Sequence, residues 1–127
     1  MPDDYTISEH RDLTVNERQL LEWLLENGSS EASNYWPQMT EVKVVGHCSC
    51  GCPTIDLAIG GKDSRTVGPS TILCDAQGHS PEGVPLMVTL HVREGELSEL
   101  EVITDYDVGV CTIPAPAMLE PIRWTDT

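Results

Sequence analysis

The sequence predicts an α+β fold: an N-terminal helical pair packed on one face of a roughly five-stranded, mainly antiparallel meander sheet. Three observations lead to this prediction. A capped, leucine-rich helix begins near residue 14, an apolar/polar alternation over residues 84–106 is typical of a β-hairpin, and shorter alternating runs lie between them. The length of 127 residues suits one domain, and no internal repeat divides it.

The N-terminal region is expected to contain a mobile acidic leader, residues 1–12, ahead of a single domain spanning residues 13–127. Thr14 and Glu17 have the spacing of a capping box, in which each side chain accepts a hydrogen bond from the other residue's backbone N–H. The apolar stripe expected to face the sheet consists of Leu20, Leu21, Leu24 and Leu25.

A shorter second helix is predicted over residues 31–36. Ser30 is a suitable cap, and Pro37 should end the helix because proline disfavours a helical residue before it. The three strands expected next cover residues 42–46, 55–59 and 71–75. Beyond them, the proline-rich residues 109–127 exclude a long helix and are expected to wrap along the surface.

The predicted hairpin has a three-residue turn, Arg93-Glu94-Gly95, with Gly95 in the left-handed conformation. This turn places Leu100 opposite Val88 on a core face. Glu99 and Glu101 then lie on the opposite, water-facing side, because a slip of one residue would reverse every side chain.

The charge distribution limits the possible partners. The net charge is −14, with −6 in residues 1–31, zero in residues 32–70 and −8 in residues 71–127. So few basic residues argue against binding of a nucleic-acid backbone, whereas a basic protein partner would be attracted. The first residues do not resemble a signal peptide, and no apolar run is long enough for a membrane span. Five cysteines, an odd number, fit thiols in a reducing cytoplasm.

The candidate partner-binding surface is the acidic face of the hairpin. Its residues are His91, Glu99, Glu101 and Asp105. A solvated sheet face of ordinary composition explains the same pattern. His91 is also the candidate acid/base group if the protein is a small enzyme.

The candidate metal ligands are Cys48, Cys50, Cys52 and Cys74, with His47 or His79 as alternatives to Cys74. Thiolates and imidazole are the ligands that Zn²⁺ prefers. The one-residue gaps argue against this interpretation, because zinc hairpins usually carry C-x2-C pairs. The alternatives are that the cysteines act as small apolar fillers of a tight turn, or that one of them is a redox or nucleophilic group.

Several stretches together show a resemblance to known proteins: Leu13-Thr14 with Glu17, then VVGHCSCGCPTIDL, then GELSELEV. They resemble a group of small uncharacterised bacterial proteins that share a CxCGCPTIDL segment. This resemblance carries no functional residue with it. The size, acidity and layout are also similar to those of the immunity proteins of bacterial toxin systems, which implies a cytosolic inhibitor of a basic partner.

The leading functional hypothesis is therefore a small acidic cytosolic binding protein, immunity-like or inhibitor-like, without a cofactor. A zinc-binding module built on the cysteines is the alternative, followed by a small enzyme. The sequence leaves the oligomeric state open.

Overall fold

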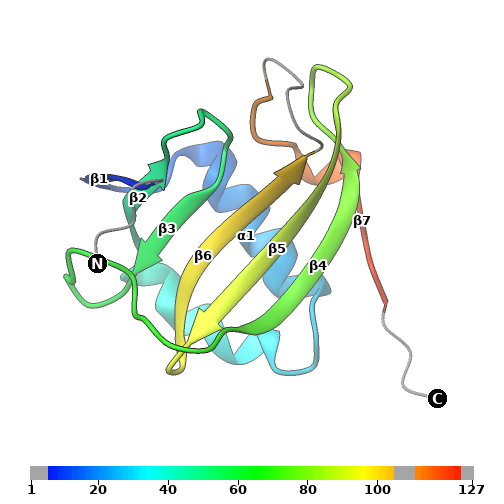
Figure 1. Ribbon diagram of the computed structural model, residues 1–127. Coiled ribbons are helices and arrows are strands. Elements are labelled where there is room, and N and C mark those ends of the chain that lie inside the picture. Colours follow the sequence, from blue (N-terminus) through cyan, green and yellow to red (C-terminus); the bar gives the residue numbers. More distant parts are fainter. Residues whose placement is uncertain (1–5, 105–110, 124–127) are drawn as a thin grey trace.

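The computed structural model describes residues 6–104 and 111–123, which form one α-helix, two 3-10 helices and a seven-stranded sheet (Figure 1). All strand pairs are antiparallel, and the strand order is β1-β2-β3-β6-β5-β4-β7. The strands are β1 (Thr6–Arg11), β2 (Lys43–Cys48), β3 (Ile55–Ala58), β4 (Thr71–His79), β5 (Pro85–Arg93), β6 (Glu96–Thr104) and β7 (Leu119–Pro121). The α+β prediction with an antiparallel sheet is confirmed, whereas the number of strands was underestimated by two.

The sheet combines two three-stranded meanders with the short edge strand β7. One contains β1 to β3, the other contains β4 to β6, and they join where Ile55 of β3 pairs with Leu100 of β6. A single meander order was therefore a wrong expectation, because β4 follows β3 in the chain but lies two strands beyond β6. The long connection over residues 59–70 passes along the end of the sheet (Figure 1).

The two additional strands lie at the edges of the sheet. Thr6–Arg11, which the sequence analysis assigned to a mobile leader, is β1 and pairs with β2; residues 1–5 lie outside the described part. Arg11 fixes this strand, because its guanidinium binds both carboxylate oxygens of Glu17 at 2.8 and 3.0 Å. The expected C-terminal wrap contains β7, which pairs with β4 and buries Leu119.

Helix α1 (Val15–Asn27) covers the inner face of the sheet (Figure 1). The predicted capping box is present: the Thr14 hydroxyl accepts the Glu17 N–H at 3.1 Å, and Glu17 accepts the Thr14 N–H at 2.9 Å. The four stripe leucines are at most 2% exposed and join the same core as the inner-facing residues of the hairpin.

The second helix differs from its prediction. Residues Ala32–Thr40 form a 3-10 helix, η1, which follows Glu31 and passes through Pro37. Pro37 has no N–H to donate and its ring clashes with the preceding turn of an α-helix, so this segment does not continue as an α-helix. Another short 3-10 helix, η2 (Pro116–Met118), precedes β7. The expected helical pair is therefore one α-helix and a 3-10 segment.

The hairpin register corrects the predicted turn. Glu94 and Gly95 have φ values of 52° and 75°, so two residues form the turn, and a bulge follows at His91/Val92. Because of the bulge, each side chain lies on the face of the sheet that was predicted for it. The pairing is shifted by two residues from the predicted register, so that Val88 lies opposite Val102. The prediction of Val88 opposite Leu100 is wrong, whereas the burial of these apolar residues is confirmed.

Among the described residues, no helix has the length and apolar character needed to cross a bilayer.

Replacing Glu94 with asparagine should stabilise the protein. Glu94 adopts a left-handed backbone conformation, which costs free energy for most side chains but suits asparagine at this position of a two-residue turn. We expect Glu94→Asn to raise the free energy of unfolding by about 0.5–1 kcal/mol in urea titrations. The exposed Glu26→Asn is the control for loss of one negative charge, and an equal effect of both changes would contradict the turn geometry.

The ion pair between Arg11 and Glu17 should make stability depend on pH. Burial opposes ionisation of Glu17, but hydrogen bonds from Arg11 and Thr14 outweigh it and lower the pKa of the carboxyl. A lowered folded-state pKa stabilises the protein above the ordinary value near 4.5, and that contribution is lost as the pH falls through the folded-state pKa.

We therefore expect Glu17→Gln to lower the free energy of unfolding at pH 7 by about 1 kcal/mol and to cost less below pH 4. Urea titrations at several pH values measure both effects. Glu26→Gln is the matched control on the exposed side of α1. A cost of Glu17→Gln that is the same at pH 3.5 and pH 7 would contradict the role of this carboxylate.

Candidate metal centre

The cysteine cluster lies on the tight connection between β2 and β3. The Cys48 N–H donates to the Thr54 carbonyl, and the Gly51 N–H donates to the Cys48 carbonyl, both at 3.2 Å. Gly51 has a φ of 89°, a conformation that favours glycine. On an extended strand, alternate residues are separated by roughly 6.6 Å. This turn brings alternate cysteines closer, which removes the spacing argument against a metal site.

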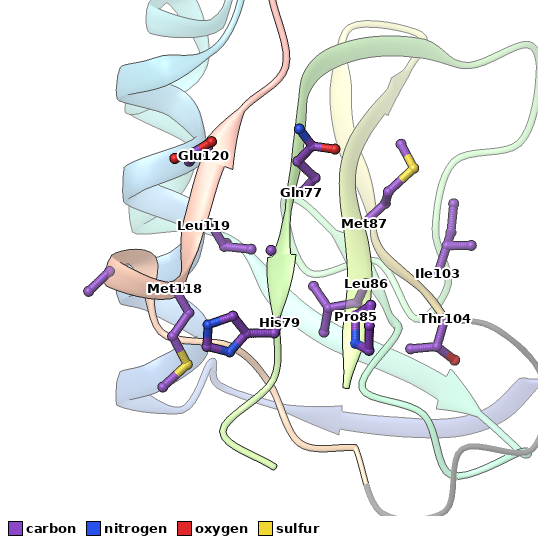
Figure 2. Close-up of a pocket in the computed structure, with 12 residues that line it drawn as sticks. Gln77, His79, Pro85, Leu86, Met87, Ile103, Thr104, Met118, Leu119 and Glu120 are labelled. Carbon is purple, nitrogen blue, oxygen red and sulfur yellow. The ribbon is translucent and has the colours of Figure 1, made fainter. Parts of the chain in front are cut away.

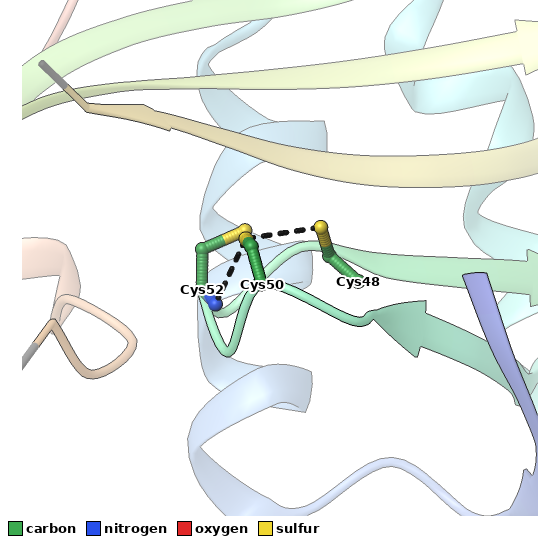
Figure 3. Close-up of side chains that lie close together, drawn as sticks. All are labelled: Cys48, Cys50 and Cys52. Atoms are coloured by element: carbon green, nitrogen blue, oxygen red, sulfur yellow. Dashed lines mark hydrogen bonds between the residues drawn. The ribbon is translucent and has the colours of Figure 1, made fainter. Parts of the chain in front are cut away.

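The sulfur atoms of Cys48, Cys50 and Cys52 all lie within 4.8 Å of one another (Figure 3). The Cys48 thiol donates to Cys50 Sγ at 3.0 Å, and the Cys52 N–H donates to the same sulfur at 3.3 Å. A Zn–S length of about 2.3 Å in a tetrahedral site corresponds to sulfurs about 3.8 Å apart. Small rotations of these side chains would therefore suffice to coordinate one ion.

The thiols of Cys48 and Cys50 differ in acidity. Hydrogen bonds from Cys48 and Cys52 lower the pKa of Cys50. Burial, together with the thiol hydrogen bond to Cys50, raises the pKa of Cys48 to about 12. Of these two sulfurs, Cys50 therefore ionises more readily, and the thiolate is the form that coordinates metals and attacks electrophiles.

The residues considered as fourth ligands lie elsewhere. Cys74 is 5% exposed on β4, and β6 and β5 separate this strand from β3 by about 14 Å in total. Burial raises the pKa of Cys74 to about 11. His47 contacts Glu9, with 2.6 Å between Nδ1 and the carboxylate, and Nδ1 of His79 lies 3.0 Å from the Ser80 carbonyl. The expected four-cysteine set is therefore reduced to three.

Cys111 is a nearby thiol that the sequence analysis missed. It lines the same hollow as Cys52, and burial followed by the charge of Glu82 raises its pKa. Its sulfur is outside the group of mutually close ligand atoms. The sequence carries no signal for this proximity, because Cys111 is more than 50 residues from the cluster and approaches it only through the fold.

The three cysteines line a groove of about 390 Å³ on the outer face of the sheet, the face opposite α1. Thr54 forms part of its wall and accepts the Val102 N–H at 2.9 Å, which ties the end of the cysteine loop to β6. The charged residues along the groove are Asp56, Arg65, Glu99 and Glu101. Arg65 comes from the 59–70 connection, and the sequence analysis gave it no role.

The expected acidic surface is on the outer face, but basic side chains lie against its carboxylates: two arginines beside Glu99 and a histidine beside Glu101. Arg93 approaches Glu99 at 3.3 Å, Arg65 lies 3.7 Å from the same carboxylate, and His91 Nε2 lies 2.8 Å from Glu101. The side chains of His91 and Glu99 are only 12% and 17% exposed. Asp105 lies outside the described residues. The predicted residues are thus adjacent, in a mixed-charge arrangement.

A second hollow, of about 690 Å³, lies beside the groove on the outer face (Figure 2). Ile103 and Thr104 line both, and the larger hollow continues toward His79 and Met118. Its labelled side chains are mainly apolar, with Met87 and Ile103 projecting from neighbouring strands (Figure 2). Among the described residues it contains no group of possible metal ligands, so it offers space for a ligand but no metal-binding side chains.

Comparisons of the chain with protein-family models, with curated proteins and with solved structures find no match. The functional conclusion therefore rests on the geometry of the cysteine loop and its groove.

The thiols should react in an order set by this geometry. Cys50 is exposed and has a lowered pKa, whereas Cys74 is buried with a raised pKa. We expect limiting iodoacetamide at pH 7.5 to modify Cys50 at least tenfold faster than Cys74 in reduced, metal-free protein, measured by peptide mass spectrometry. Equal rates in native protein would contradict the described loop; urea-unfolded protein is the control in which the rates should converge.

Proposed function

We propose that this protein binds a thiophilic metal ion, principally Zn²⁺, through Cys48, Cys50 and Cys52. The observation that supports the proposal is the convergence of three sulfur atoms within 4.8 Å on a hydrogen-bonded turn. Soft sulfur ligands favour Zn²⁺ and Cu⁺ over the hard cations that prefer oxygen. The hydrogen bonds that favour a Cys50 thiolate also favour the ligand form of that residue.

The metal would have a functional role rather than a purely structural one. The described core already contains 23 buried residues, most of them from α1, η1 and the sheet, so folding would not depend on a metal as it does in a small zinc finger. The cysteine loop lies at the rim of that core, with Cys50 exposed. An ion held there is accessible to other molecules.

The immunity-like hypothesis, in which an acidic face binds a basic partner, stays a prediction, as does the cytosolic location. The net charge of −14 supports it, whereas the guanidinium groups of Arg65 and Arg93 beside Glu99 reduce the negative potential of the face expected to dock. The cysteine loop is the better-supported site, because its ligand atoms already converge.

Metal binding is tested with reduced, chelator-stripped protein. We expect one equivalent of Zn²⁺ to bind, measured by competition with a chromogenic chelator and by elemental analysis after gel filtration. Cys48→Ser, Cys50→Ser and Cys52→Ser should each weaken binding by about a hundredfold or more, because each removes one thiolate. Parallel titrations with Cu⁺ show which ion the site prefers.

Cys74→Ala is the matched control, since this cysteine lies in the core and away from the loop. It should retain wild-type affinity even if it lowers stability, and circular dichroism verifies folding of each variant. Retention of less than a tenth of an equivalent of both ions by folded wild-type protein would refute the proposed function.

A further inference from the structure

The three cysteines supply one ligand fewer than tetrahedral Zn²⁺ requires. Among residues 6–104 and 111–123, no fourth cysteine, histidine or carboxylate belongs to the group of mutually close ligand atoms. Sites with three protein ligands and one open position are those at which Zn²⁺ takes an external ligand. The fourth coordination position of a zinc ion held by the three cysteines would therefore be open, and the direction in which it faces determines which ligands can reach it.

The groove on the outer face is the approach to that position. All three cysteines line it, whereas Cys52 alone among them lines the hollow that contains Cys111. Cys111 thus approaches the loop from another side. A ligand in the groove would meet the three sulfurs, which converge as Figure 3 shows, and the charged residues of β3, β6 and the 59–70 connection.

The charge of the site selects the donor. Three thiolates around Zn²⁺ carry a net charge of about −1, which weakens the ion as a generator of hydroxide, whereas the softness of the site suits a further sulfur donor. The groove adds the three carboxylates of Asp56, Glu99 and Glu101 against one guanidinium, that of Arg65. Arg93, which lies beside Glu99, offsets part of this charge from a neighbouring position. A ligand with a positive charge is favoured over an anionic one.

We propose that a small cationic thiol is the fourth ligand of a metal ion held by Cys48, Cys50 and Cys52, with its positive group in the groove beside Glu101. This inference rests on the proposed metal-binding function. The thiol loses its proton to solvent, its sulfur bonds to the metal, and one water leaves, so no electron is transferred and no oxidant is required. The site thereby becomes a receptor for thiols of a chosen charge.

The test uses Co²⁺-loaded protein under anaerobic conditions, because the visible and sulfur-to-metal absorption bands of Co²⁺ report each added thiolate. Two probes differ mainly in charge at the end of the same two-carbon thiol: thiocholine, which is cationic, and 2-mercaptoethanesulfonate, which is anionic. We expect thiocholine to raise the sulfur-to-metal absorption by the amount that one added thiolate contributes. At low salt it should bind at least about tenfold more tightly than 2-mercaptoethanesulfonate, and the difference in affinity should shrink as salt screens the charges.

Glu101→Gln should reduce this preference to about threefold or less while leaving Co²⁺ uptake unchanged, since Glu101 lines the groove without belonging to the ligand group. Glu26→Gln, on the opposite side of the molecule, should retain the full preference. Equal or tighter binding of the sulfonate, or an unchanged preference in Glu101→Gln, would overturn the inference and leave metal binding intact.

Cys111→Ser distinguishes the remaining outcomes. If neither thiol changes the Co²⁺ spectrum and Cys111→Ser removes one thiolate from it, Cys111 is the fourth ligand and the inference is wrong although the metal site is real. If thiols bind and Cys111→Ser leaves the spectrum unchanged, the open position is supported. Failure of the protein to take up Co²⁺ or Zn²⁺ at all would remove both the inference and the proposed function.

Discussion

The packing of α1 on one face of the sheet determines where this protein can carry out chemistry. The four stripe leucines are essentially inaccessible to water, and each contributes on the order of 2 kcal/mol through burial. They occupy the inner face together with residues such as Leu57, Leu90 and Leu100. Because successive side chains of a strand alternate between faces, this packing also directs Asp56, Glu99 and Glu101 to the outer face. The groove beside the cysteines is a consequence of how the core is filled.

The sequence predicted which side chains of the hairpin face the core, but it predicted the register of the two strands only in part. Burial of Val88, Leu100 and Val102 follows from the period of two, which survives any register shift by two residues. The two-residue turn and its bulge have the same effect on the faces as a three-residue turn, so the pattern does not distinguish them. The two edge strands were missed because an edge strand needs little apolar alternation. The polar strand Thr6–Arg11 is held by backbone pairing with β2 and by Arg11. The three-residue strand Leu119–Pro121 is held by its pairing with β4 and by one buried leucine.

For the cysteines, the sequence pattern argued against a site that the folded structure allows. Their one-residue spacing argues against a metal site on an extended strand, and the argument fails because Gly51 allows the chain to turn inside the cluster. Cys74 was grouped with them on residue type, but the order of strands places it across the sheet. That order depends on the β3–β6 pairing, a long-range contact between residues about 45 positions apart in the chain. Local patterns carry no information about such a contact, which also explains why Arg65 and Cys111 received no role.

The arrangement of charged side chains on the outer face changes how the large negative net charge is interpreted. A uniform acidic surface would oppose ionisation of neighbouring thiols, because carboxylates and thiolates are both negatively charged. Arg65 and Arg93 lie among the carboxylates beside the groove, where they limit that repulsion without making the groove positive. A metal ion bound by three thiolates would lie in a moderately negative surround, which discourages anionic competitors for its open position. The same carboxylates that first suggested a protein-docking face therefore fit better as the electrostatic setting of the cysteine loop.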